Sequence, residues 1–290
     1  MERREFIRSI GLLSLTAAAM KLNAINKMVE PFGNTKPMPV LFLGHGNPMN
    51  AIEENEFTKG WQDAAKSIPR PNAILCISAH WETDGTFVTA MNKPETIHDF
   101  GGFPKPLFDF QYPAPGDPEL AQQAKLGITK TIIGLNTDWG LDHGAWVVAS
   151  RLYPKADIPI IQLSLNYGKS ADWHYELAKE LAFLRRKGVL IIGSGNVVHN
   201  LGMLNWKDDK PFDWAIDANE TVKKLITAHD YKSLANYKAL GSAMQLAVPS
   251  AEHYLPLMYT LALQEENENI SFFNDKTVMG SISMTSLIIS

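Results

Sequence analysis

Short apolar runs with many β-branched residues recur along the chain from about residue 39. They cover residues 39–44, 72–79, 158–165, 188–195 and 281–289. Each run has the length of a strand, and the apolar side chains at nearly every position indicate strands that are buried on both faces. The pattern therefore predicts a sheet that is covered by helices.

Segments with a helical pattern lie between these runs. They cover residues 55–68, 118–127, 171–188, 213–230 and 251–267. Asp117 followed by Pro118 is typical of a helix start, and Gly188 follows the last turn of the clearest helix as a stop. Alternating strands and helices predict an α/β fold. We expect one domain over residues 38–290, with a largely parallel or mixed central sheet flanked by helices.

The first 37 residues differ from this pattern. Arg3 and Arg4 precede a short apolar run from Ile10 to Met20 that ends in small residues. This layout is typical of a secretory signal, and the paired arginines are typical of the twin-arginine route that exports folded proteins. We predict a leader and linker over residues 1–37, export to the periplasm, and no stable membrane insertion after signal removal. The alternative is a cytoplasmic protein with a floppy leader or a surface helix.

Composition and charge narrow the classes of function. The chain has 290 residues, of which 45% are hydrophobic and 20% charged, and this suits a globular protein with a sizeable core. A net charge of -4 without any basic run argues against a nucleic-acid partner. Cys76 is the only cysteine, so the chain forms no internal disulfide.

Five of the eight histidines lie beside predicted strand ends or helix starts: His45, His80, His143, His199 and His253. The carboxyl ends of the strands in an open α/β sheet form the ligand crevice, so these side chains are expected to converge there. Neutral imidazole is the commonest protein ligand for transition metals. We therefore predict a metal site at the carboxyl ends of the strands. We interpret the glycines beside these histidines as space for a metal and its substrate.

The other three histidines fit this pattern less well. His174 is expected on the surface or packing edge of helix 171–188, and His229 at a helix end in a structural role. His98 lies in a Gly/Pro-rich loop with Phe100 and Phe103. It is either part of a pocket for an aromatic substrate or an ordinary loop residue. A single buried histidine is more often a hydrogen-bonded core residue than a ligand, and only the grouping favours a metal.

Seven sequence motifs resemble, in order, those of the class III extradiol ring-cleaving dioxygenases, with the 4,5-DOPA dioxygenase type of bacteria and plants as the nearest branch. They are LFLGHGNPM, SAHWET, TIHDFGGFP, YPAPGDPELA, DHGAW, GSGNVVHNL and EHYLPLMY. The resemblance runs from about residue 38 to the C-terminus. It does not include the leader, which proteins of this branch need not have.

The resemblance implies one divalent metal, with ferrous iron expected for activity, although zinc can occupy the same site. It implies that His45, His80, His199 and His253 surround the metal. Glu252 competes with His253 for the position at which the wider family has a carboxylate. His143 and His199 are the implied catalytic acid/base residues, and His199 is either a ligand or a proton-transfer residue outside the ligand set.

The implied reaction is ring cleavage of a catechol by dioxygen, such as 4,5-cleavage of DOPA to a muconic semialdehyde. His98, Trp81 and Tyr254 are the candidate substrate contacts, although aromatic residues near the cleft fit core packing equally well.

Two alternatives use the same fold. One is a zinc-dependent hydrolase that activates water, and the other is a non-catalytic protein that binds a metal or an aromatic ligand. The sequence does not indicate an oligomeric state.

Overall fold

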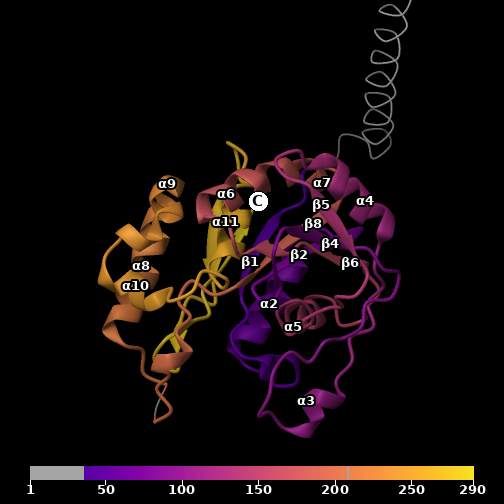
Figure 1. Cartoon of the computed structure of the whole chain (residues 1–290). Coiled ribbons are helices and arrows are strands. Elements are labelled where there is room, and N and C mark those ends of the chain that lie inside the picture. The colour runs from indigo at the N-terminus through magenta and orange to yellow at the C-terminus, as the bar shows by residue number, and fades with distance from the viewer. Residues whose placement is uncertain (1–35, 208) are drawn as a thin grey trace, which may run out of the picture. The chain divides into compact units, whose positions relative to one another are not determined.

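A six-stranded mixed sheet forms the centre of the computed structural model, which describes residues 36–207 and 209–290. Residues Pro37–Ser290 form one compact unit. The strand order is β6-β2-β8-β1-β12-β9, and Figure 1 labels four of these strands, β1, β2, β6 and β8. The strands are β1 (Val40–Gly44), β2 (Ala73–Ser78), β6 (Ile160–Gln162), β8 (Val189–Gly195), β9 (Ile270–Phe273) and β12 (Ser286–Ile289). The predicted α/β fold with a mixed sheet is confirmed, whereas the predicted leader lies almost wholly outside the described residues.

Strands β1, β2, β6 and β8 are parallel, and they form the part of the sheet that carries the site. Every residue of β1, β2 and β8 is buried, as expected for strands with helices on both faces. Gly44 pairs with Gly195, and Ser78 pairs with Ser194. This register ends the three strands at nearly the same level, so the residues that follow them meet at one edge.

Helices cover both faces of the sheet. Their bounds are α2 (Glu56–Ser67), α3 (Lys105–Asp109), α4 (Pro118–Gly127), α5 (His143–Leu152), α6 (Ala171–Ala178), α7 (Ala182–Arg185), α8 (Asp213–Thr227), α9 (Tyr231–Ala235), α10 (Ser242–Ala247) and α11 (Leu255–Leu261). Helices α2 and α5 pack on the face that carries Leu41 and Leu43. Helices α4, α6, α8 and α11 pack on the opposite face, with Val40 and Phe42. Among the described residues, no helix is long and apolar enough to cross a membrane.

Two predicted strands are broken in the structure. The segment 158–165 divides into β6 and β7 (Leu165–Asn166), because the N–H of Ser164 leaves the main sheet and donates to the Phe87 carbonyl. The segment 281–289 divides into β11 (Ile282–Ser283) and β12 around Met284. The buried hydroxyl of Ser283, the last residue of β11, donates to the Asn219 side chain. Buried hydroxyl groups need such partners, and here they lie outside the strand ladder.

Six short strands form three small sheets beside the main one. These are β3 (Glu82–Thr83) with β7, β4 (Thr86–Thr89) with β5 (Ile133–Asn136), and β10 (Thr277–Val278) with β11. Apart from β7 and β11, which belong to broken predicted runs, the sequence pattern did not predict them. Strands of two to four residues carry too little periodicity to be recognised.

Two predicted helices also differ from the structure. The segment 251–267 becomes helical only from Leu255, because Pro256 is tolerated in the first turn of a helix but not inside it. The segment 171–188 is interrupted by the 3-10 turn η2 (Lys179–Leu181). His174, expected at the surface or a packing edge, is fully buried and contacts the Tyr259 hydroxyl at 2.9 Å. Its helix packs against α11, and this contact buries the side chain.

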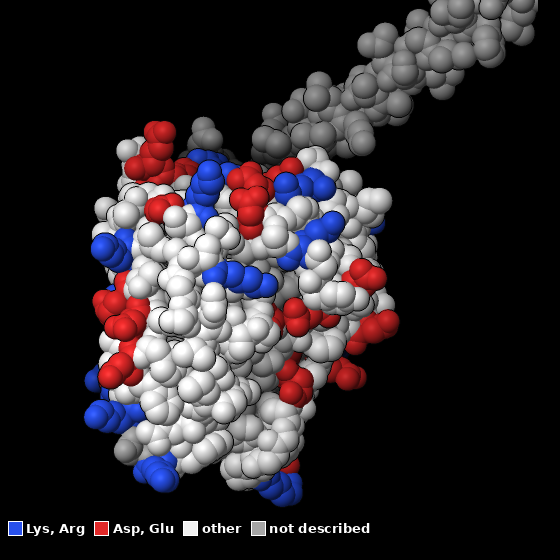
Figure 2. Space-filling model, turned by 60° about the vertical axis from the view of Figure 1, so that its left-hand side comes forward, with Lys and Arg blue, Asp and Glu red and all other residues white. Residues whose placement is uncertain are grey.

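Charged side chains of both signs are interspersed on the face shown in Figure 2. Blue and red residues lie mainly at its upper part and along its edges, and the described residues of this face form no extended basic patch. This distribution agrees with the slightly negative net charge of -4.

Candidate metal centre and catalytic cavity

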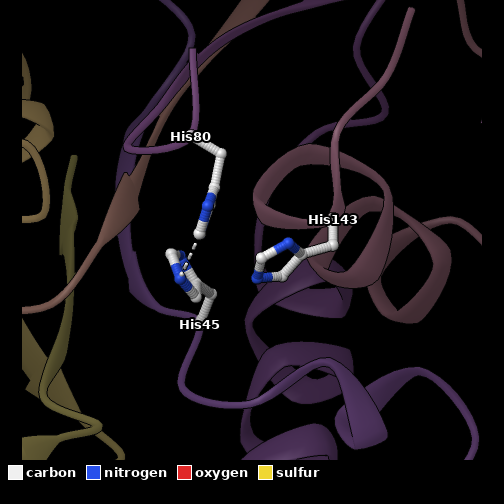
Figure 3. Close-up of side chains that lie close together, drawn as sticks. All are labelled: His45, His80 and His143. Carbon is white, nitrogen blue, oxygen red and sulfur yellow. Dashed lines mark hydrogen bonds between the residues drawn. The ribbon is translucent and has the colours of Figure 1, made fainter. Parts of the chain in front are cut away.

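The five histidines singled out by the sequence line one cavity of about 870 Å³. They come from the end of β1, the turn after β2, the first residue of α5, the segment after β8 and the turn before α11. Figure 3 shows His45, His80 and His143 turned toward one another. The ring centroids of His45 lie 5.0 Å from His80, 5.7 Å from His143 and 5.2 Å from His253. The predicted convergence of these side chains is therefore confirmed.

Hydrogen bonds fix the orientation of the rings. Ser194 donates its hydroxyl hydrogen to the Gly144 carbonyl at 2.5 Å, so it accepts from Nδ1 of His45 at 3.0 Å. Nδ1 of His253 donates to Glu252 at 3.1 Å. These partners assign the proton of each ring to Nδ1. Nε2 of both histidines is then left with a lone pair, which is the form that binds a metal.

Nε2 of His45 and Nε2 of His80 are 3.2 Å apart. Nδ1 of His80 faces the carboxylate of Asp99 at 3.4 Å, so its proton also belongs on Nδ1. Two lone pairs at this separation repel each other unless a cation lies between them. Two nitrogens bound to one zinc ion at about 2.0–2.1 Å in tetrahedral geometry are about 3.3 Å apart. This pair of nitrogens therefore fits a metal ion.

His253 supplies a second sign of a metal. Its Nε2 is buried and has no hydrogen-bond partner among the described residues. A buried polar atom without a partner costs about 1–3 kcal/mol, and a bound metal ion would remove that cost. The donor set therefore fits the divalent metal that the sequence predicts.

Two triads of potential ligands have their atoms within 4.8 Å of one another: His45, His80 and His143, and His199, Glu252 and His253. The rings of His199 and His253 are stacked, with centroids 3.4 Å apart and planes at 8°. The lone pair of each imidazole nitrogen lies in the plane of its ring. Because the two rings are stacked in nearly parallel planes, one ion cannot lie in both planes and bind both nitrogens well. The Glu252 carboxylate already accepts hydrogen bonds from His253 and Ser250. His253, whose Nε2 has no partner, is therefore the member of the second triad best suited to join the His45–His80 pair as a ligand.

Burial keeps the imidazoles neutral. It lowers the pKa of His45 and His253 well below the usual value, and the neighbouring histidines lower it further. Burial also lowers the pKa of His80 to about 3 and that of His199 to about 4. Neutral imidazole is the form that binds metals and accepts protons. The cavity thus holds His45, His80, His199 and His253 in that form near neutral pH.

Asp99 is the main site residue that the sequence analysis missed. Its Oδ1 accepts from Nδ1 of His143 at 3.0 Å and from the His143 backbone N–H at 2.9 Å, while its Oδ2 faces His80. Although burial alone would raise the pKa of Asp99, the hydrogen bonds from His143 hold it below the usual value. One carboxylate therefore orients two histidines from different elements. The sequence feature that could have indicated Asp99 as a site residue was its position directly after His98.

The three predicted substrate contacts do not line the cavity. Trp81 is buried and stacks on Trp139 with ring centroids 5.9 Å apart. Tyr254 is buried and donates its hydroxyl hydrogen to the Leu234 carbonyl. Nε2 of His98 contacts the Phe110 carbonyl at 3.0 Å. Sequence position beside a strand end or in a loop did not reveal where these side chains point. Trp81 and Tyr254 pack in the buried interior, whereas the half-buried His98 ring contacts the Phe110 carbonyl.

Other aromatic residues form the wall of the cavity. Phe100 and Phe103 line it, and the Phe100 ring lies edge-on to His143 at 5.5 Å and 83°. Tyr112 and Trp146, by contrast, belong to the core on the α5 face. The loop around His98 therefore contributes to the cavity through its phenylalanines.

The glycines beside His45 allow the close approach of Met284, and Gly46 also lines the cavity. A Cβ atom on Gly44 would lie 2.6 Å from the Met284 carbonyl carbon. Gly46 has a positive φ of 63°, and a Cβ there would lie 2.5 Å from the Met284 sulfur. These glycines admit the broken C-terminal strand. The room that the sequence predicts beside Gly44 is taken by Met284, whereas Gly46 lines the cavity as expected for a glycine near a ligand.

Replacing Asp99 by Asn should weaken metal binding about 10–100-fold, because loss of a partner that orients a ligand histidine has this effect. Turnover should fall as well, since His143 loses its charged partner. Competition with a chelator measures the metal affinity, and thermal unfolding checks the fold. The matched control is Asp109→Asn, which removes an exposed carboxylate paired with Lys105. Wild-type affinity and turnover in Asp99→Asn would contradict the positioning role.

Comparison with known proteins agrees with this geometry. The family model described as the catalytic LigB subunit of aromatic ring-opening dioxygenase matches residues 24–279. A relative from Escherichia coli K12, named 4,5-DOPA dioxygenase extradiol, is 47% identical over 255 residues, covering 86% of this chain and 94% of the relative. A relative of the same name from Beta vulgaris is 37% identical over 249 residues, covering 83% and 92%.

A solved structure also matches the fold. The crystal structure of an uncharacterized protein from Escherichia coli K12 has a TM-score of 0.77 and 43% sequence identity, and the match covers 87% of this chain and 100% of that one. The family match spans most of the chain and includes all five cavity histidines. The chain therefore belongs to the family of the catalytic LigB subunit of aromatic ring-opening dioxygenases, and it is a metal-dependent oxidoreductase that cleaves catechol rings in the extradiol manner.

Proposed function

We propose that the protein cleaves DOPA or a closely similar catechol, using ferrous iron held by His45, His80 and His253. The observation that carries this ligand set is the buried, unpartnered Nε2 of His253, together with the close pair of Nε2 atoms on His45 and His80. The names of the Escherichia coli and Beta vulgaris relatives support DOPA as the substrate. Iron is favoured over zinc because zinc cannot activate dioxygen by redox chemistry.

When bound at His45, His80 and His253, ferrous iron would supply the redox chemistry that lets dioxygen react with a catechol. The ring itself would lie among apolar side chains of the cavity. Phe100 and Phe103 line it from the loop after β4. Such walls exclude water and orient a planar ring. The chain thereby supplies binding and orientation for the reacting ring.

His143 is the candidate base that deprotonates a catechol hydroxyl. Its Nδ1 donates to Asp99, so its Nε2 carries the lone pair. This arrangement, with a carboxylate behind the imidazole, orients the ring and stabilises the imidazolium that forms when the proton arrives. We place His143 outside the ligand set because, unlike His253, it has no buried nitrogen that lacks a partner.

His199 is the candidate for the second proton transfer. It lines the same cavity and stacks on His253, so a metal held by Nε2 of His253 would lie outside the plane of the His199 ring. Burial lowers its pKa to about 4, so the ring is neutral near pH 7. His143 and His199 would thus provide, from beside the proposed ligand set, the proton transfers that ring cleavage requires.

Oxygen uptake by the protein loaded anaerobically with ferrous iron tests this proposal. With DOPA, we expect uptake of one dioxygen per DOPA and a yellow product. The matched control is the same protein loaded with zinc, which should bind DOPA without consuming oxygen. Ester hydrolysis by the zinc form, without uptake by the iron form, would favour the hydrolase. Binding of DOPA to the iron form without consumption would favour the binding protein.

A further inference from the structure

The mouth of the cavity carries negative but no positive side chains. Glu53 and Asp209 line it together with Trp206, and no Lys or Arg is among its described lining residues. We propose that this mouth selects catechols whose side chain carries an ammonium group over catechols whose side chain carries only a carboxylate. The inference rests on the proposed function, since it concerns the part of the substrate that does not react.

Glu53 is exposed, and its carboxylate has no hydrogen-bond or ion-pair partner among the described residues. The nearby guanidinium of Arg151 forms its ion pair with Glu54 instead, and it reaches only the backbone carbonyl of Glu53. The negative charge of Glu53 is therefore not compensated by the protein. A cation in the cavity would be its first partner.

Asp209 lies on the segment after β8 that forms another part of the mouth. Its Oδ1 accepts from the Met279 backbone N–H at 2.6 Å, and this bond fixes the carboxylate beside the cavity. Lys276 is near enough to interact with Asp209, but its ammonium pairs with Glu56 at 2.6 Å. Asp209 therefore keeps part of its negative charge available to a ligand.

Trp206 is independent evidence for a positively charged group on the ligand. Its side chain is 78% exposed, although it is the largest apolar type, and it stacks on no other described aromatic ring. The face of an indole attracts an ammonium group by a cation–π interaction, and Trp is the best of the aromatic residues for this contact. An exposed Trp beside two carboxylates is a suitable surface for a cationic group.

The position of the mouth relative to the histidines matches the shape of such a substrate. When both catechol oxygens lie at the histidines, the side chain of the ring points away from them, toward the opening. The buried Nε2 of His253 marks the inner end of the cavity as a ligand site. The charges at the mouth then act on the side-chain end of the substrate.

The effect of each carboxylate should be moderate because both are exposed. Ion pairs between exposed groups change an equilibrium by about 1.5- to 5-fold, and salt weakens them. A carboxylate at the mouth raises the affinity for an ammonium and lowers it for another carboxylate. The two effects multiply in the ratio of the two affinities, which is therefore the quantity to measure.

Three catechols with similar side chains test the proposal: dopamine with one positive charge, DOPA with no net side-chain charge, and 3-(3,4-dihydroxyphenyl)propionate with one negative charge. Their dissociation constants are measured by calorimetry on the zinc-loaded protein without oxygen, so that turnover does not interfere. We expect the tightest binding for dopamine and the weakest for the propionate. Glu53→Gln should reduce the ratio of their affinities about 2- to 10-fold, and Glu53→Gln with Asp209→Asn should reduce it further.

Glu266→Gln is the matched control, because it removes the same charge from an exposed side chain that does not line the cavity. It should leave the ratio unchanged. Equal or tighter binding of the propionate, or a ratio that Glu53→Gln does not change, would overturn the charge preference. Oxygen uptake by the iron-loaded protein is measured with the same three compounds. Uptake without a charge preference would overturn this inference alone, whereas the preference without any uptake would overturn the proposed function alone.

Discussion

The His253→Ala protein should lose its metal, whereas the His199→Ala protein should keep it and lose turnover. His253 presents a buried Nε2 that has no other partner, and His199 is stacked on it with parallel rings. Removing a ligand should weaken metal binding by more than about 100-fold, beyond the effect of losing an orienting partner. Removing a proton-transfer residue should reduce kcat by about 10²–10⁴-fold. Metal content after dialysis and oxygen uptake with DOPA measure the two effects separately.

The control for both variants is His229→Asn. His229 is an exposed histidine with a positive φ of 54°, a conformation that Asn tolerates better than Ala does. This variant should keep both metal and turnover. Full metal content in His253→Ala would show that His143 or Glu252 completes the ligand set. Loss of metal in His199→Ala would make His199 a ligand.

Arg185→Ala should destabilise the fold by about 3–5 kcal/mol, because it leaves the partners of a buried charge uncompensated. The Arg185 side chain is fully buried. It donates to the Met38 carbonyl at 2.7 Å and the Leu263 carbonyl at 2.5 Å, and it pairs with the Glu268 carboxylate. It thus joins the start of β1 to the segment after α11. Urea unfolding monitored by circular dichroism measures the loss.

Arg186→Ala is the neighbouring control, since Arg186 pairs with Glu265 at the surface. An exposed pair of this kind contributes at most about 1 kcal/mol. A loss below that value in Arg185→Ala would show that the buried network does not stabilise the fold. Equal losses in the two variants would likewise remove the distinction between the buried and the exposed arginine.

The buried strands were predictable because parallel strands under two helical layers leave little place for polar side chains. Residues 40–44 and 189–195 lie within the predicted runs. The positions of His45 and His80 followed from those strands, since the carboxyl ends of parallel strands form one edge of a sheet. The histidines converge because they follow parallel strands of one sheet, and the apolar pattern of the sequence is enough to predict those strands.

Side-chain direction and long-range contacts were not predictable in this way. Trp81 lies one residue after His80, yet it stacks on Trp139, away from the cavity. Asp99 reaches two histidines that are distant in sequence, and no local pattern records such a contact. The space beside Gly44 is filled by Met284, a residue 240 positions away along the chain. These features are set by tertiary packing, which the local pattern does not contain.

Incorporation of ¹⁸O from labelled dioxygen tests the central claim most directly. The iron-loaded protein is mixed with DOPA in one turnover under ¹⁸O₂, and the product is analysed at once by mass spectrometry, before its aldehyde oxygen exchanges with water. Extradiol cleavage predicts a ring-opened product that contains both labelled oxygen atoms, and this label is absent when the zinc-loaded protein is used. Unaltered DOPA, or a product whose new oxygen comes only from water, would contradict the assignment of this cavity as the site of dioxygenase chemistry.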